Sequence, residues 1–157
     1  MVEGMIHYLE REQVIPGTMK DIWEFFCNPY NLNTITPPDM NFKIINGGDR
    51  KMYPGQMIEY RVEFIRGIRS LWLTEITHVR EGEFFVDEQR IGPYRLWHHE
   101  HIFESMNGGV KMTDRVTYVL PFWFLGDIVH AVWVRRRLDS IFDFRTQTTT
   151  ELFGNLK

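Results

Sequence analysis

The periodicity of the apolar residues changes once along this chain, at Pro121. Before it, several short segments place an apolar side chain at every second position, most clearly QMIEYRVEFI at 56–65. A period of two is typical of an antiparallel strand with one buried face. After Pro121 the apolar residues follow helical spacing from about Leu125 to Phe153, with no further proline, which predicts one long helix.

Turn signals divide the first part of the chain into strands. Pro16-Gly17 ends the first of them, and Thr18 is a suitable N-cap for a short helix from Met19 to Cys27, with one more helical turn expected near Asn31. The expected strands are 5–15, 41–46, 56–65, 68–79, 83–90, 94–105 and 110–120. The fold class is therefore α+β, with two short helices after the first strand.

Sequential antiparallel strands joined by tight turns form a curved sheet, and Asn107-Gly108-Gly109 is a strong hairpin signal. The apolar face of such a sheet has to be covered, and the long C-terminal helix is the only expected element large enough to cover it. We expect about six or seven strands wrapped around that helix, in one domain over residues 1–157.

The aromatic content is high, at 15% of the residues, with twelve Phe, six Tyr and five Trp. Two interpretations remain open. The aromatic side chains either fill an ordinary core or line a cavity, since ligand pockets are mostly apolar with a few polar groups.

Charge and motif content exclude several function classes. The net charge of −3 argues against a nucleic-acid partner, and no apolar run approaches the ~18 residues of a membrane span. Cys27 is the single cysteine, so no internal disulfide forms, and the N-terminus lacks the apolar stretch of a signal peptide. We predict a cytoplasmic protein without stable membrane insertion and leave the oligomeric state open.

Segments spread over nearly the whole chain share a pattern with one superfamily: IWEFF at 22–26, NL at 31–32, TPP at 36–38, FVDEQ at 85–89, GPY at 92–94, WHHEHIF at 97–103, DRVTY at 114–118 and LP at 120–121. They resemble the START-like superfamily, also called the SRPBCC or polyketide cyclase/dehydrase-like group, and within it small bacterial ligand-binding proteins of unknown function. The resemblance implies a single START-like domain of the helix-grip type with a deep cavity between sheet and long helix. Its members include lipid carriers, plant hormone-binding proteins and aromatase/cyclases.

The strand positions that point apolar side chains to one face of the sheet also point polar side chains to that face. Polar groups are costly to bury unless they are hydrogen-bonded. Together with two positions on the long helix, these strand positions give the candidate ligand-binding residues: Tyr60, Val62, Trp72, Phe85, Asp87, Gln89, Trp97, His99, His101, Phe103, Asp114, Val116, Tyr118, Val132 and Arg136. Arg136 is included as a cation that reaches inward to an anionic head group.

The polar members allow three interpretations. They bond one another as a buried structural network, they orient the polar end of an apolar ligand, or His99, His101 and Asp114 carry out general acid–base catalysis. A metal is a further hypothesis, because His99-x-His101 puts two imidazoles on one strand face and a carboxylate across the sheet completes three ligands. Such pairs are common without a metal, and no Cys cluster or third spaced His accompanies this one. We predict no metal and no cofactor.

The predicted function is binding or transport of a small hydrophobic molecule, such as a lipid, an aromatic or a polyketide-like compound. A non-enzymatic role is favoured, since nucleotide-binding loops, a nucleophile elbow and CxxC pairs are missing from the sequence. One alternative is a cyclase- or dehydratase-type enzyme that uses His99, His101 and Asp114. The other is a protein-interaction domain whose core is filled.

Overall fold

The computed structural model describes residues 5–121, 128 and 130–155. Its strands form one antiparallel sheet in the order β1-β7-β6-β5-β4-β3-β2. The strands are β1 (His7–Pro16), β2 (Lys43–Asn46), β3 (Gln56–Ile65), β4 (Ile68–Arg80), β5 (Phe84–Ile91), β6 (Leu96–Met106) and β7 (Gly109–Val119). Only the contact between β1 and β7 joins strands that are distant in the sequence, because every other neighbour follows its predecessor along the chain.

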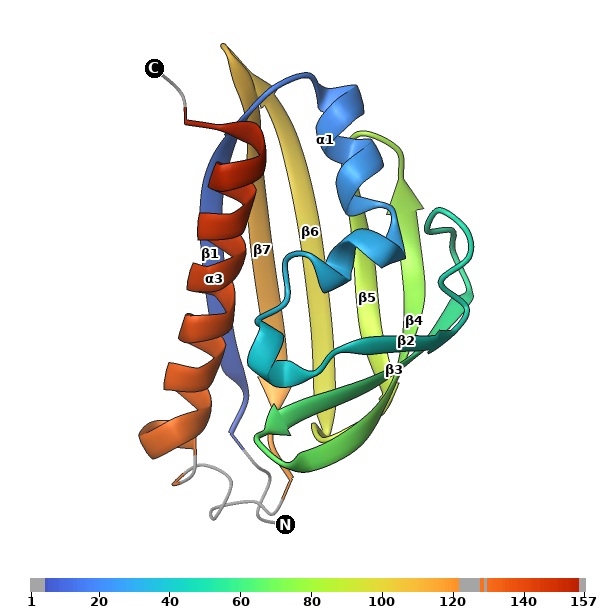
Figure 1. Cartoon of the computed structure of the whole chain (residues 1–157), viewed down its shortest axis with the longest axis vertical. Coiled ribbons are helices and arrows are strands. Elements are labelled where there is room, and N and C mark those ends of the chain that lie inside the picture. The colour runs from blue at the N-terminus through green and yellow to red at the C-terminus, as the bar shows by residue number, and fades with distance from the viewer. Residues whose placement is uncertain (1–4, 122–127, 129, 156–157) are drawn as a thin grey trace.

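The helical segments lie on one face of this curved sheet (Figure 1). They are α1 (Met19–Phe26), the 3₁₀ turns η1 (Pro29–Asn33) and η2 (Pro38–Met40), the π-helical turn η3 (His130–Val134) and the long helix α3 (Arg135–Phe153). Thr18 caps α1, because its hydroxyl oxygen accepts a hydrogen bond from the Asp21 N–H at 3.2 Å. In Figure 1, α3 runs along the β1 side of the sheet, and α1 lies across the end of the sheet at which it contacts β6 and β7.

The fold predicted from the sequence is confirmed: a curved antiparallel sheet, short helices after the first strand and a long C-terminal helix. The ends of the expected strands differ from the observed ends by two residues or fewer, because alternation and turn residues mark both the face and the limits of a strand. The expected start of the long helix, Leu125, lies outside the described residues.

The core has two main parts, one under each helix. Under α3, Leu138, Ile141 and Phe142 are buried against strand residues such as Val116 and Tyr118. Under α1, Ile22, Trp23 and Phe26 pack on the other end of the sheet, where the Trp23 ring meets the Phe103 ring edge-on at 5.3 Å.

Cys27 lies in the core under α1 with 2% of its surface exposed. Burial raises the pKa of its thiol to about 12, because an ionised sulfur is poorly solvated there. The thiol is therefore protonated and unreactive in the folded chain.

Among the described residues, no helix is long and apolar enough to cross a membrane.

Candidate functional site

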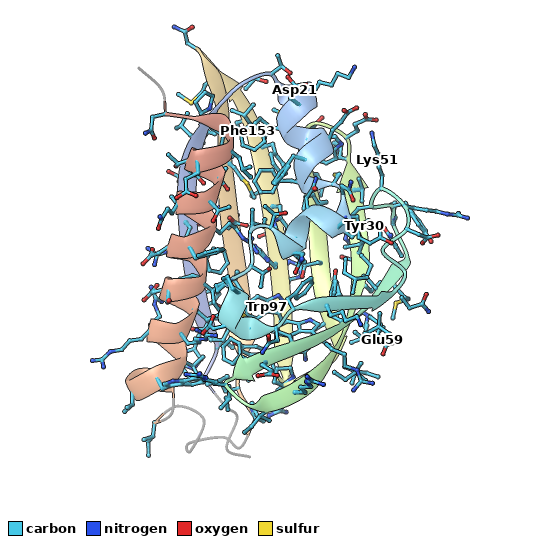
Figure 2. All side chains as sticks on the ribbon, in the orientation of Figure 1. Asp21, Tyr30, Lys51, Glu59, Trp97 and Phe153 are labelled. Atoms are coloured by element: carbon cyan, nitrogen blue, oxygen red, sulfur yellow. The ribbon has the colours of Figure 1, made fainter. Side chains whose placement is uncertain are left out.

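A cavity of about 140 Å³ lies between the sheet, the α1–η1 segment and α3. Its walls are mostly aromatic and aliphatic, with Phe42, Trp72, Phe85, Trp97 and Phe142 among the large side chains. Side chains fill most of the remaining space between the sheet and the helices, with Trp97 inside and Tyr30, Lys51 and Glu59 at the periphery (Figure 2). The cavity is thus a mostly apolar space within an otherwise packed interior.

One wall of this cavity is polar, and the register of three strands builds it. Asp87 on β5 pairs directly with His99 on β6, and His101 on β6 pairs directly with Asp114 on β7. Residues 99 and 101 are two positions apart, so both side chains point to the same face of the sheet. Two histidines on the central strand are therefore held between two carboxylates on its neighbours.

All four ring nitrogens of these histidines face carboxylate oxygens. His99 Nε2 lies 2.8 Å from Asp114 Oδ1, and His101 Nε2 lies 2.7 Å from Asp87 Oδ2. The second nitrogens are farther away: His99 Nδ1 is 3.4 Å from Asp87 Oδ2, and His101 Nδ1 is 3.1 Å from Asp114 Oδ1. Both histidines are buried, with exposed fractions of 4% and 6%.

The helix contributes one cation to this wall. Arg145 on α3 places Nη1 3.4 Å from Asp114 Oδ1, and its guanidinium lies 5.1 Å from the centre of the Phe142 ring. Its side chain is 12% exposed and lines the cavity. Arg145 thus connects the helix to the buried carboxylates of the sheet.

The pKa directions within the wall give one charge state. Burial by itself raises the pKa of Asp87 and Asp114, but the two histidines outweigh it and hold both values below the usual range. Burial, together with the positive charge of His101, lowers the pKa of His99. Burial also opposes the charge on His101, yet its close contacts with the Asp114 and Asp87 carboxylates raise its pKa overall.

Two ionised aspartates, protonated His101, the Arg145 cation and neutral His99 give a cluster with no net charge. A buried cluster of zero net charge avoids most of the cost of placing ions in a medium of low dielectric constant. Protonating His99 as well would add an uncompensated positive charge, in agreement with the lowered pKa of that residue.

Most of the candidate ligand-binding residues from the sequence lie in the cavity lining. They are Tyr60, Val62, Trp72, Phe85, Asp87, Trp97, His99 and His101. Asp114 lies beside the two histidines, and Val116 and Tyr118 are fully buried in the core under α3. Phe103 packs under α1, and the Gln89 side chain bonds the backbone of Tyr94 at 2.6 and 3.1 Å, where it holds the turn before β6.

Val132 and Arg136 do not reach the cavity. Val132 is 64% exposed, and Arg136 is exposed on the outer face of the helix. The residues that α3 turns inward are Leu138, Ile141 and Arg145, and Arg136, two positions before Leu138, lies about 160° from it around the helix at 100° per residue. The sequence interpretation joined two different faces of the helix.

Arg145 is the charged cavity residue that the sequence analysis missed, and apolar lining residues such as Phe42 and Phe142 were also not among the candidates. Arg145 follows Leu138 by seven positions and Ile141 by four, the spacing of one helix face. A search for charged residues in phase with that apolar stripe finds it.

Comparison with protein-family models and with curated protein sequences gives no match. Solved structures do match over nearly the full length of the chain. Protein CV1439 from Chromobacterium violaceum superimposes with a TM-score of 0.72 at 9% identity, over 95% of this chain and 98% of that one. Major latex-like protein 151 from Panax ginseng gives 0.70 at 13%, over 96% and 99%.

A third structure, Ara h 8.0201, matches with a TM-score of 0.64 at 19% identity, over 94% of this chain and 99% of that one. The chain has the START-like fold. At these identities the likeness concerns the fold alone. The fold resemblance inferred from the sequence is therefore confirmed.

The two histidines should titrate on opposite sides of their ordinary pKa of 6.5. In folded protein we expect His101 to remain protonated above that pH and His99 to remain neutral below it. Nitrogen and carbon chemical shifts of the imidazole rings, followed by NMR over a pH series, test this. The same rings in urea-unfolded protein provide the control, because both should then titrate near 6.5. Identical titrations of the two rings in the folded protein would contradict the charge assignment.

The linked effect on stability follows the sign of each shift. His101, with a raised pKa, stabilises the fold below pH 6.5, and this contribution is lost as the pH rises through its folded-state pKa. His99, with a lowered pKa, costs stability as the pH falls below 6.5. The two aspartates stabilise the fold above pH 3.8, and their contribution declines on further acidification.

Asp114→Asn should destabilise the fold by about 3–5 kcal/mol, because it leaves the Arg145 and His101 cations without one buried carboxylate. Urea unfolding measures the loss. Asp143→Asn on α3 is the matched control, since the Asp143 side chain is 75% exposed, and we expect a change within about 0.5 kcal/mol. Equal effects of the two substitutions would show that the buried network contributes nothing to stability.

Proposed function

We propose that this protein binds a small, mostly apolar molecule of one or two rings in the cavity between its sheet and α3. The observation that carries the proposal is the character of the lining, which is aromatic on most sides and polar on one wall. Binding sites for small molecules have this composition, because apolar walls supply affinity and a few polar groups fix the orientation. A protein-interaction domain with a filled core needs no such cavity.

The volume favours a compact ligand over a lipid chain. A cavity of about 140 Å³ is close to the engineered apolar cavity of ~150 Å³ that takes up benzene. Pockets for drug-sized ligands are larger, at ~300–1,000 Å³. An aromatic compound is therefore the proposed class, and a long acyl chain fits only if α3 moves away from the sheet.

The polar wall suggests how such a ligand is oriented. Asp87, His99 and His101 line one side of the cavity, and Tyr60 also belongs to its lining. Burial raises the pKa of Tyr60, so its hydroxyl remains a donor. A ligand with an oxygen atom at one end would be held by these groups, with its ring against Trp72.

The cavity should bind 1-naphthol with a Kd between about 1 μM and 1 mM, which isothermal titration calorimetry measures. Leu138→Trp fills part of the space and should weaken binding at least tenfold, because Leu138 lines the cavity. Leu152→Trp, at a 50% exposed position on the same helix, is the control and should leave the Kd within twofold. The proposal fails if 1-naphthol does not bind, or if both variants bind it like the unsubstituted protein.

A second candidate, an acid–base enzyme of the cyclase or dehydratase type, is favoured by the pairing of His99 with Asp114. A neutral imidazole whose Nε2 donates to a buried carboxylate keeps a lone pair on Nδ1, the arrangement of a general base. His99→Gln separates the two candidates. Binding of 1-naphthol should survive this change, whereas turnover of a polyketide-like substrate, if the protein has it, would be lost.

A further inference from the structure

One ring nitrogen of each histidine faces the same oxygen of Asp87. His101 Nε2 is 2.7 Å from Asp87 Oδ2, and His99 Nδ1 is 3.4 Å from the same atom. One ligand atom from each of the three residues lies within 4.8 Å of the other two. Ligand atoms about 2.1 Å from a shared metal ion are ~3.0–3.4 Å apart in octahedral or tetrahedral geometry. The distances of 2.7 and 3.4 Å to Asp87 Oδ2 lie close to this range.

The other ring nitrogen of each histidine faces Asp114 instead. His99 Nε2 and His101 Nδ1 both face Asp114 Oδ1, at 2.8 and 3.1 Å. A histidine that binds a metal almost always donates its other N–H to a carboxylate or carbonyl, which fixes the tautomer and the ring orientation. Asp114 supplies that acceptor to both rings at once, and Arg145 holds Asp114 at 3.4 Å.

The two imidazole rings have too few N–H groups to donate a hydrogen bond from every nitrogen that faces a carboxylate. A neutral imidazole has one N–H and one lone pair, whereas ionised carboxylates only accept hydrogen bonds. Even with His101 protonated, the two rings have three N–H groups for four nitrogens that face carboxylate oxygens, so one lone pair is turned toward a carboxylate. The buried Nδ1 of His101 also makes no hydrogen bond of good geometry. A metal cation beside Asp87 removes this mismatch between N–H groups and acceptors. The nitrogens that face Asp114 then each donate an N–H to it, and the nitrogens that face Asp87 turn their lone pairs to the ion.

We propose that Asp87, His99 and His101 form a binding site for a divalent transition-metal ion of the zinc class, with open coordination positions facing the cavity. Two imidazoles and a carboxylate are donors that suit Zn²⁺, Co²⁺ and Fe²⁺, and three protein ligands leave room for water or a ligand. Strand register holds the three residues in place, and the Phe85 ring, stacked on His101 at 4.1 Å, supports one imidazole. The sequence analysis predicted no metal, and the proposal departs from that prediction because Asp114 lies against both rings.

Metal binding has a proton cost that follows from the same geometry. A metal ion binds an imidazole nitrogen through its lone pair, so protons compete with the ion for His99 Nδ1 and His101 Nε2, the two nitrogens that face Asp87. The groups that face the histidines are Asp87 from β5, Asp114 from β7 and Arg145 from α3. We therefore expect the affinity to fall with acidification.

The test uses untagged, chelator-treated protein and the metal alone. Isothermal titration calorimetry with Zn²⁺ should show one ion per chain. His101→Gln should weaken binding at least 100-fold, and Asp114→Asn about 10- to 100-fold. His98→Gln is the matched control, because His98 lies on the same strand but its ring bonds Glu88 on the opposite face at 2.9 Å. It should leave the affinity within twofold.

A measurement on the unsubstituted protein covers the case in which a variant fails to fold. Zn²⁺ should shift the imidazole NMR signals of His99 and His101 and leave those of His98 unchanged, and Co²⁺ should give a visible absorption band of a nitrogen- and oxygen-bound ion. No binding at one ion per chain, shifts at His98 alone, or a His101→Gln protein that binds as tightly as the original would overturn the proposal. Because no organic ligand is present, metal binding and 1-naphthol binding succeed or fail separately.

Discussion

The hydrogen-bond register between β5, β6 and β7 determines the chemistry of this protein's interior. It sets His99 and His101 side by side, with ring centres 3.7 Å apart, and brings one carboxylate to each side of the pair. A slip of one residue in β6 would turn both imidazoles to the opposite face and remove the histidine partners of Asp87 and Asp114. Correct pairing of these strands is therefore tied to charge balance as well as to apolar packing.

The helical layer depends on that register in turn. Arg145 reaches Asp114 from α3, and Leu138 and Phe142 pack beside it, so the helix has both an electrostatic and an apolar contact with the sheet. The cavity lies where these contacts leave space between the helix and the strand wall. Its position is a consequence of how α3 is seated, and a ligand there would contact strand and helix side chains together.

Sequence reasoning succeeded where a short-range pattern decides the structure. Alternation gave the strands, glycine and proline gave their ends, and parity placed Asp87, His99 and His101 on the inner face. It failed near the start of the C-terminal helix, where Val132 in η3 and Arg136 in α3 were assigned to the buried face. The π-helical turn His130–Val134 precedes the regular helix, and such a turn shifts the phase of the residues before it relative to those after it.

Other features could not be obtained from a pattern. Parity shows that residues share a face but not which of them touch, so Asp114 lying against both histidines required the observed register. The turn that Gln89 holds and the exclusion of Phe103 from the cavity depend on packing between segments distant in the sequence. The size of the cavity likewise reflects the fit of many side chains, and no local sequence signal encodes it.

The reactivity of the single thiol, Cys27, reports on local opening of the fold. Cys27 lies at the end of α1 and is almost fully buried, because α1 packs on the sheet around it. A thiol that is protonated and covered reacts only in the molecules whose α1 has momentarily left the sheet. The rate at which an alkylating reagent consumes it therefore reports how often this end of the fold opens, without any label being introduced.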